Sequence, residues 1–115
     1  MALVNKVGMV VHPVADLDQA QKFYEEILGL KLKFRDGERF CAFDVNGVTI
    51  ALAAHEERLT TAPAVSYKVD DAQTALATLT AAGAKPLSDL MEGPHEHRAV
   101  LADPAGNPFV IYSSK

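Results

Sequence analysis

Hydrophobic and polar positions in the first half of the chain predict four strands and one helix. Valine-rich or alternating segments read as strands; they cover residues 6–14, 30–35, 39–45 and 48–54. Between the first two strands, Asp16 is placed to cap a helix and Gly29 to end it. An apolar stripe at helical spacing lies between these two residues; it consists of Ala20, Phe23, Tyr24, Ile27 and Leu28.

The second half repeats the same order of elements. Strands are predicted at residues 64–69, 84–90, 97–102 and 108–114. Asp71 takes the place of Asp16 before a second helix, and Gly83 takes the place of Gly29. The second helix has a thinner apolar stripe; it consists of Ala75, Leu76, Leu79 and Ala82.

Two copies of one unit define the expected fold class. We expect an α+β protein with two tandem β-α-β-β-β modules, about residues 5–55 and 62–114, that form curled mixed sheets around a central cavity. One helix covers only one face of each sheet, so the second copy would close the other face and leave a concave space for a small molecule. The alternative is an unrelated α+β sandwich. With 115 residues, the chain is expected to form a single domain.

Composition narrows the range of partners and compartments. Hydrophobic residues make up 49% and charged residues 23% of the chain, as in ordinary globular proteins. The net charge of -4 argues against nucleic acid as the main partner. We find no membrane-spanning segment and no signal peptide, and the lone Cys41 excludes an internal disulfide. These features favour the cytoplasm.

Three stretches carry a resemblance to a known family. The segments VADLDQAQKFYEEILGL, DVNG and LADPAGNPFVIY resemble the vicinal oxygen chelate superfamily, which includes glyoxalase I, bleomycin-resistance proteins and extradiol dioxygenases. The resemblance extends over nearly the whole chain. It implies paired modules around a cavity and a homodimer, but a fold of this kind hosts many functions, so the reaction must be inferred from the site.

Members of that superfamily that are enzymes hold a divalent metal on the first and last strands of each module. The matching residues here are Met9, Ala51, Ala64 and Val110. Divalent cations of this kind need oxygen or imidazole donors, which alanine and valine lack, and a thioether is a poor substitute. We therefore expect no metal and no cofactor.

Strand alternation assigns side chains to the expected cavity. Eight residues are predicted to bind the ligand: Met9, Phe40, Thr49, His55, Ser66, Lys68, His97 and Tyr112. By the repeat, Ala99 and Leu101 are expected on the same face as His97. Lys68 is either a contact for an anionic ligand or a side chain that reaches to water.

Other polar or reactive residues are expected away from the cavity. His12 and Cys41 are predicted on the helix-facing side, the first as a structural histidine and the second as a buried thiol. Lys31, Lys33 and Arg35 alternate along one predicted strand and would form a charged rim or a clamp for an anion.

Two functions follow from these observations. The first is a metal-free protein, similar to bleomycin-resistance proteins, that binds a small hydrophobic or planar organic molecule between its modules. The second is a lyase, isomerase or dioxygenase that uses a relocated metal site of His55, His95 and His97, or an acid–base pair of His97 and Tyr112. Whether the protein is an enzyme is left open by the sequence.

Overall fold

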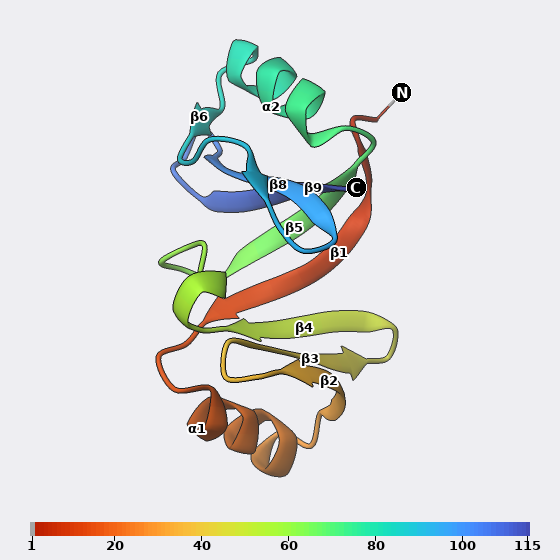
Figure 1. Cartoon of the computed structure of the whole chain (residues 1–115), viewed down its shortest axis with the longest axis vertical. Coiled ribbons are helices and arrows are strands. Elements are labelled where there is room, and N and C mark those ends of the chain that lie inside the picture. Colours follow the sequence, from red (N-terminus) through yellow and green to blue (C-terminus); the bar gives the residue numbers. More distant parts are fainter. Residues whose placement is uncertain (1) are drawn as a thin grey trace. The chain divides into compact units, whose positions relative to one another are not determined.

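A computed structural model describes residues 2–115 of the chain (Figure 1). The chain divides into two compact units. The first unit is Met9–Pro63; the second unit joins residues 2–8 to residues 64–115. Each unit is an α+β structure with one mixed sheet and a helix of its own, so the predicted fold class is confirmed.

The first unit is built from one stretch of chain. Its strands follow the order β2-β3-β4-β1, with β1 parallel to β4 and the other neighbours antiparallel. A helix comprising α1 and a π-helical turn η1 packs against β3 and β4, and a short 3-10 helix, η2, follows β4. The bounds are β1 Val4–Pro13, α1 Leu17–Lys22, η1 Phe23–Ile27, β2 Lys31–Asp36, β3 Phe40–Val45, β4 Val48–Ala53 and η2 His55–Glu57.

The second unit repeats the arrangement with the beginning of β1 at one edge. Its order is β1-β5-β9-β8-β6, with β5 parallel to β9, and β7 also pairs with β8. Strand β7 lies between two predicted strands, in a segment where no strand was predicted, and β6 is shorter than predicted. The bounds are β5 Ala64–Val69, α2 Ala72–Ala81, β6 Lys85–Pro86, β7 Met91–Glu92, β8 Glu96–Ala102 and β9 Pro108–Ser114.

Each unit has its own hydrophobic core between helix and sheet. In the first unit the core lies under α1; its buried members are Leu17, Cys41, Phe43, Leu52 and Ala54. In the second unit it lies under α2; its buried members are Val69, Ala72, Ala75, Ala99, Leu101 and Ile111. The predicted helix-facing position of Cys41 is confirmed.

The predicted helix boundaries rest on the same chemistry in both copies. The carboxylate of Asp16 accepts a hydrogen bond from the backbone N–H of Gln19 at 3.2 Å, and Asp71 accepts one from Gln73 at 3.1 Å. These bonds satisfy backbone donors that the first helical turn leaves without a partner. Beyond the helices, Gly29 has φ 75° and therefore adopts the left-handed conformation expected of a C-terminal glycine.

The apolar stripe predicted for the first helix is only partly correct. The N–H of Leu28 donates to the carbonyl of Phe23 at 3.1 Å, which is an i to i+5 bond typical of a π-turn. This wider winding turns the later residues away from the sheet. Ala20 and Tyr24 pack against the core, whereas Phe23, Leu28 and Ile27 are 49%, 53% and 72% exposed.

The register of the second β-hairpin is shifted by one residue relative to the repeat. Four residues separate the paired Asp44 and Thr49, whereas five separate the paired Ala102 and Pro108. The longer loop is organised by Asp103, whose carboxylate accepts hydrogen bonds from the backbone N–H groups of Ala105 and Asn107. The side chain of Asn107 also donates to this carboxylate, and these bonds lower the pKa of Asp103.

This extra residue reverses the faces of β8 relative to the repeat, because side chains alternate along a strand. Ala99 and Leu101 lie in the core under α2. His97 lies opposite Ser113, whose Oγ accepts a hydrogen bond from the N–H of Ala72 at the start of α2. The expectation that these three residues of β8 share the face of the predicted cavity is therefore wrong.

Strand β2 also departs from simple alternation. Its pairing with β3 shifts between Leu32 and Phe34, so Lys33 is an additional residue in a β-bulge. After the bulge, Arg35 lies opposite Cys41 on the side of the helix. The prediction that Lys31, Lys33 and Arg35 share one face is therefore wrong for Arg35.

Candidate functional site

The face of the first unit's sheet opposite α1, here called the first helix-free face, is built largely from small residues. Ala51 lies between Val11 and Ala42 in the register of the three central strands. Ala42 and Ala51 are fully buried, and Ala53, which pairs with Phe40, is 1% exposed. These small, buried side chains make the centre of the face apolar.

Aromatic and polar groups border these small residues. The rings of Phe34 and Phe40 are stacked, with centroids 5.8 Å apart and an angle of 30° between their planes. Phe34 is 50% exposed, which is unusual for a phenylalanine that is already stacked. At the other end of the face, Lys33 Nζ donates to Thr49 Oγ1 at 3.1 Å. Met9 lies two residues before Val11 on the same strand and shares its face.

The face of the second unit's sheet opposite α2, here called the second helix-free face, carries more polar groups. One row across three strands contains Ser66, Val110 and Val100. The next row contains Lys68, Tyr112 and Arg98. Three predicted ligand-binding residues, Ser66, Lys68 and Tyr112, thus lie side by side in two adjacent rows.

Tyr112 lies across this face and reaches the beginning of β1. A Cβ built on Gly8 would overlap the hydroxyl of Tyr112 and come within 2.7 Å of its Cε1 and Cζ. Only glycine at this position leaves room for the ring. Burial, and secondarily the charge of Glu96, raises the pKa of Tyr112, so its hydroxyl stays protonated near neutral pH and can donate a hydrogen bond.

Charges on the second helix-free face are unevenly paired. Arg98 Nη1 lies 3.3 Å from Glu96 Oε1, so these two charges compensate each other. Within residues 2–115, the side chains of Ser66, Lys68 and Tyr112 form no hydrogen bond or ion pair. One ammonium and two hydroxyls are therefore left with unused hydrogen-bonding capacity on one face.

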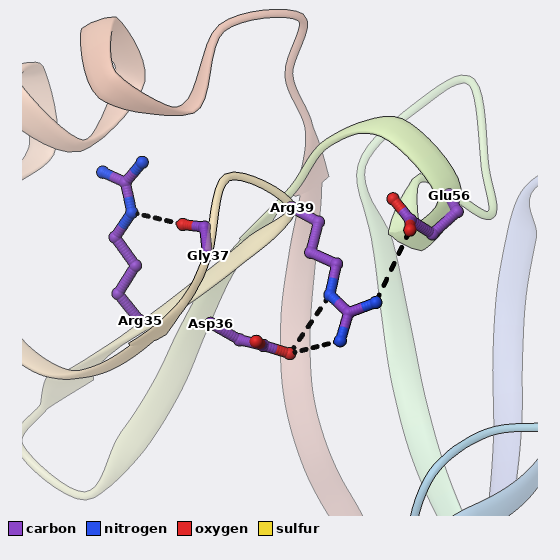
Figure 2. A network of polar contacts seen from close by, with 5 residues as sticks. All are labelled: Arg35, Asp36, Gly37, Arg39 and Glu56. Atoms are coloured by element: carbon purple, nitrogen blue, oxygen red, sulfur yellow. Dashed lines mark hydrogen bonds and ion pairs between the residues drawn. The ribbon is translucent and has the colours of Figure 1, made fainter.

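His55 lies elsewhere, beside a separate hollow of about 260 Å³ in the first unit. The residues that line it are Ala15, Asp16, Leu17, Asp18, Arg35, Glu38 and His55. Arg35 forms three polar contacts. Nη2 lies 2.7 Å from Asp18 Oδ1, and Nη1 donates to Gln21. Nε donates to the carbonyl of Gly37 (Figure 2). No pattern in the sequence predicted this hollow, because its residues come from three separate segments.

Arg39 connects the turn after β2 to the short helix that carries His55. Its guanidinium contacts Asp36 Oδ2 at 3.0 Å and Glu56 Oε2 at 3.5 Å (Figure 2). The hydrogen bond and the charge of Asp36 raise the pKa of Arg39, while the pKa of Glu56 is lowered first by its own backbone N–H and then by Arg39. His55 itself is exposed and has φ 52°.

The residues present do not fit the divalent metal of the superfamily's enzymes. Ala51, Ala64 and Val110 carry no donor atom, and Met9 offers only a thioether. Within residues 2–115, no group of three or more His, Cys, Asp or Glu side chains is arranged to hold a metal ion. His97 instead lies with its Nε2 3.6 Å from Glu92 Oε2.

The predicted ligand-binding residues thus fall into four places. Met9, Phe40 and Thr49 lie on the first helix-free face, and Ser66, Lys68 and Tyr112 lie on the second. His55 borders the hollow, and His97 lies on the side of α2. Sequence reasoning missed Phe34 because the bulge that turns it onto the first helix-free face leaves no mark in the pattern. It missed the importance of Gly8 because a glycine in a strand does not indicate which side chain lies above it. His12, as predicted, faces the helix: its ring lies 5.8 Å from that of Tyr24.

Comparison with known proteins agrees with this architecture of repeated β-α-β-β-β units. A glyoxalase-like domain is matched over residues 9–112. An uncharacterised protein of Mycolicibacterium smegmatis is 39% identical over 110 residues, covering 95% of this chain and 94% of that protein. The chain therefore belongs to the glyoxalase-like family, within the vicinal oxygen chelate superfamily.

Two solved structures share the fold at low sequence identity. A glyoxalase/bleomycin resistance protein/dioxygenase superfamily member from Vibrio splendidus 12B01 is 18% identical with a TM-score of 0.71, covering 93% of this chain and 97% of that one. Methylmalonyl-CoA epimerase from Mycobacterium tuberculosis is also 18% identical, with a TM-score of 0.72, covering 100% and 91%. At this identity the likeness concerns the fold only.

Proposed function

We propose that this protein binds a small planar or hydrophobic organic molecule on its helix-free sheet faces, without a divalent metal. The observation that carries the proposal is the composition of the first helix-free face. Its centre consists of alanine side chains, and a stacked pair of phenylalanines with one ring half exposed stands beside them. A flat apolar ligand would extend this stack and remove the exposed ring from water.

The positions that hold metal in the superfamily's enzymes support the metal-free part of the proposal. Ala51 lies in the middle of the first helix-free face, and Val110 has the same place on the second. Both are apolar, so these positions favour contact with carbon atoms of a ligand over coordination of a cation.

Thermal-shift and calorimetric titration of chelator-treated protein with planar probes such as naphthalene derivatives, indole and flavone tests the proposal. At least one probe is expected to raise the melting temperature, because a ligand selective for the native state stabilises it. Phe40→Ala should weaken this binding, whereas Leu87→Ala, at an exposed leucine of the second unit, should leave it unchanged. The proposal fails if no probe binds, or if Phe40→Ala binds as well as the wild type.

A separate titration with Ni²⁺ or Zn²⁺ tests the alternative, a metal-dependent lyase, isomerase or dioxygenase. That alternative requires Ni²⁺ or Zn²⁺ to bind stoichiometrically and to be lost in His55→Ala, His95→Ala or His97→Ala. An acid–base enzyme built on His97 and Tyr112 would need both on one face, but β8 directs His97 to the side of α2 while Tyr112 faces the other way.

The homodimer and the cytoplasmic location stay predictions. Within residues 2–115, no helix is long and apolar enough to cross a membrane. Analytical ultracentrifugation checks the expected dimer: a single species of twice the 12.4 kDa chain mass is expected, and a monomer at high concentration would contradict it.

A further inference from the structure

We infer that the ligand carries a carboxylate, and that Lys68, Tyr112 and Ser66 on the second helix-free face bind it. This inference rests on the proposed function and specifies the chemical class of the ligand. It starts from three polar side chains that lie together and have no partner within residues 2–115.

The charge balance of this face favours an anion. Arg98 is compensated by Glu96, at 3.3 Å. Lys68 is partly buried and has no carboxylate partner within the described chain. An ammonium removed in part from water gains most from a group of opposite charge. A ligand with a single negative charge would compensate Lys68 and leave the face neutral.

The two hydroxyls add donors on the same face. Lys68 lies directly opposite Tyr112 on neighbouring strands, and Ser66 precedes Lys68 by two residues on the same face. Tyr112 is protonated near neutral pH, and the absence of a side chain on Gly8 leaves room for its ring. One cation and two hydroxyl donors suit the two oxygens of a carboxylate. A phosphate dianion would keep one charge uncompensated, because Arg98 is already engaged by Glu96.

Apolar side chains beside these donors can hold the body of the ligand. Val110 lies next to Ser66, and Val100 follows it in the same row. Val110 and Val100 are 6% and 3% exposed, so a ligand with its oxygens at Lys68 would bring its hydrocarbon body to the exposed edge of this apolar row. We therefore take an aromatic carboxylate as the probe.

Calorimetric titration with naphthalene-2-carboxylate and with its neutral amide, at pH 7 and in chelator, separates this inference from the proposed function. The wild type is expected to bind the carboxylate about tenfold more tightly than the amide, since a charge-assisted hydrogen bond contributes at least that factor. Lys68→Met should abolish the preference and Lys68→Arg should keep most of it. Lys85→Met, at an exposed lysine of β6, is the matched control and should change neither affinity.

Tyr112→Phe tests the hydroxyl donor of Tyr112 separately from the charge of Lys68. It should weaken binding of the carboxylate more than binding of the amide, because a hydrogen bond to a charged acceptor contributes more than one to a neutral acceptor. Equal binding of carboxylate and amide by the wild type would overturn the inference and leave the proposed function standing. If neither of these probes binds, and no other planar probe binds, both the inference and the proposed function are overturned. A Lys68→Met variant that folds normally and keeps the preference would also overturn the inference.

Discussion

Replacing Gly8 with alanine tests whether Tyr112 lies across the second helix-free face as described. The added Cβ would overlap the hydroxyl of Tyr112 and lie 2.7 Å from two ring atoms, so the ring must move. Overpacking of this kind costs about 1–3 kcal/mol. Alanine in a strand regains about 0.5–1 kcal/mol relative to glycine, because it restricts the unfolded chain. We therefore expect Gly8→Ala to destabilise the protein by about 1–2 kcal/mol.

A double-mutant cycle attributes this cost to the ring. In a Tyr112→Ala background the obstacle is absent, so Gly8→Ala should be neutral or stabilising by about 0.5 kcal/mol. The coupling energy should then be about 2 kcal/mol, within the range measured for residues in direct contact. Urea unfolding followed by circular dichroism gives all four free energies of unfolding. The reasoning is refuted if Gly8→Ala costs the same with and without the tyrosine ring.

Three further predictions concern the cores and the helix caps. Burial raises the pKa of Cys41 from 9.0 to about 11, so the thiol ionises at lower pH in the unfolded chain than in the folded protein, and stability is lost as the pH rises from about 9 to 11, by at most about 2.7 kcal/mol. Urea unfolding at pH 8 and pH 10.5 should show this loss in the wild type and a smaller loss in Cys41→Ala; equal losses in the two proteins would contradict the prediction. Asp71→Ala removes the bonds to Gln73 and Thr74 and should cost about 1 kcal/mol, whereas Asp89→Ala, at an exposed loop position, should cost less than about 0.5 kcal/mol; similar values for both would exclude the cap. Phe43→Ala should lower the free energy of unfolding by about 3–5 kcal/mol because this side chain is fully buried. Phe34→Ala, at a half-exposed side chain of the same sheet, should lower it much less; chemical denaturation that ranks the two losses in the opposite order would contradict the assignment of the core.

The elements that local chemistry determines were predictable from sequence. Asp16 and Asp71 each precede a helix, and each accepts a hydrogen bond from its first turn in the structure. The Asn46–Gly47 turn, with φ 52° and 91°, closes the first hairpin between paired valines, and Asn-Gly is a dipeptide that strongly favours such a turn. Such signals depend on a few neighbouring residues, so a single sequence contains them completely.

Face assignments failed where one residue was added or where the helix winding changed. The five-residue loop around Asp103 shifts β8 by one position and moves His97 to the side of α2. The bulge at Lys33 does the same to Phe34 and Arg35. Because alternation has a period of two, one residue reverses every later side chain. The backbone geometry that causes these shifts is not encoded in the pattern of polar and apolar residues.

The hollow beside His55 shows a second limit of sequence reasoning. It is lined by residues from the start of α1, from β2 and its turn, and from the segment after β4. The first segment contributes four residues, the second two and the third one, and none forms a motif with the next. Only the folded register brings Arg35 to Asp18.

The most direct test of metal-free ligand binding is a titration of ¹⁵N-labelled protein with naphthalene-2-carboxylate in the presence of chelator, followed by amide chemical shifts. The account predicts shifts that saturate and centre on the strands that carry Ser66, Lys68 and Tyr112. Shifts that appear only after a divalent metal is added, and that centre on His55, His95 and His97, would contradict it.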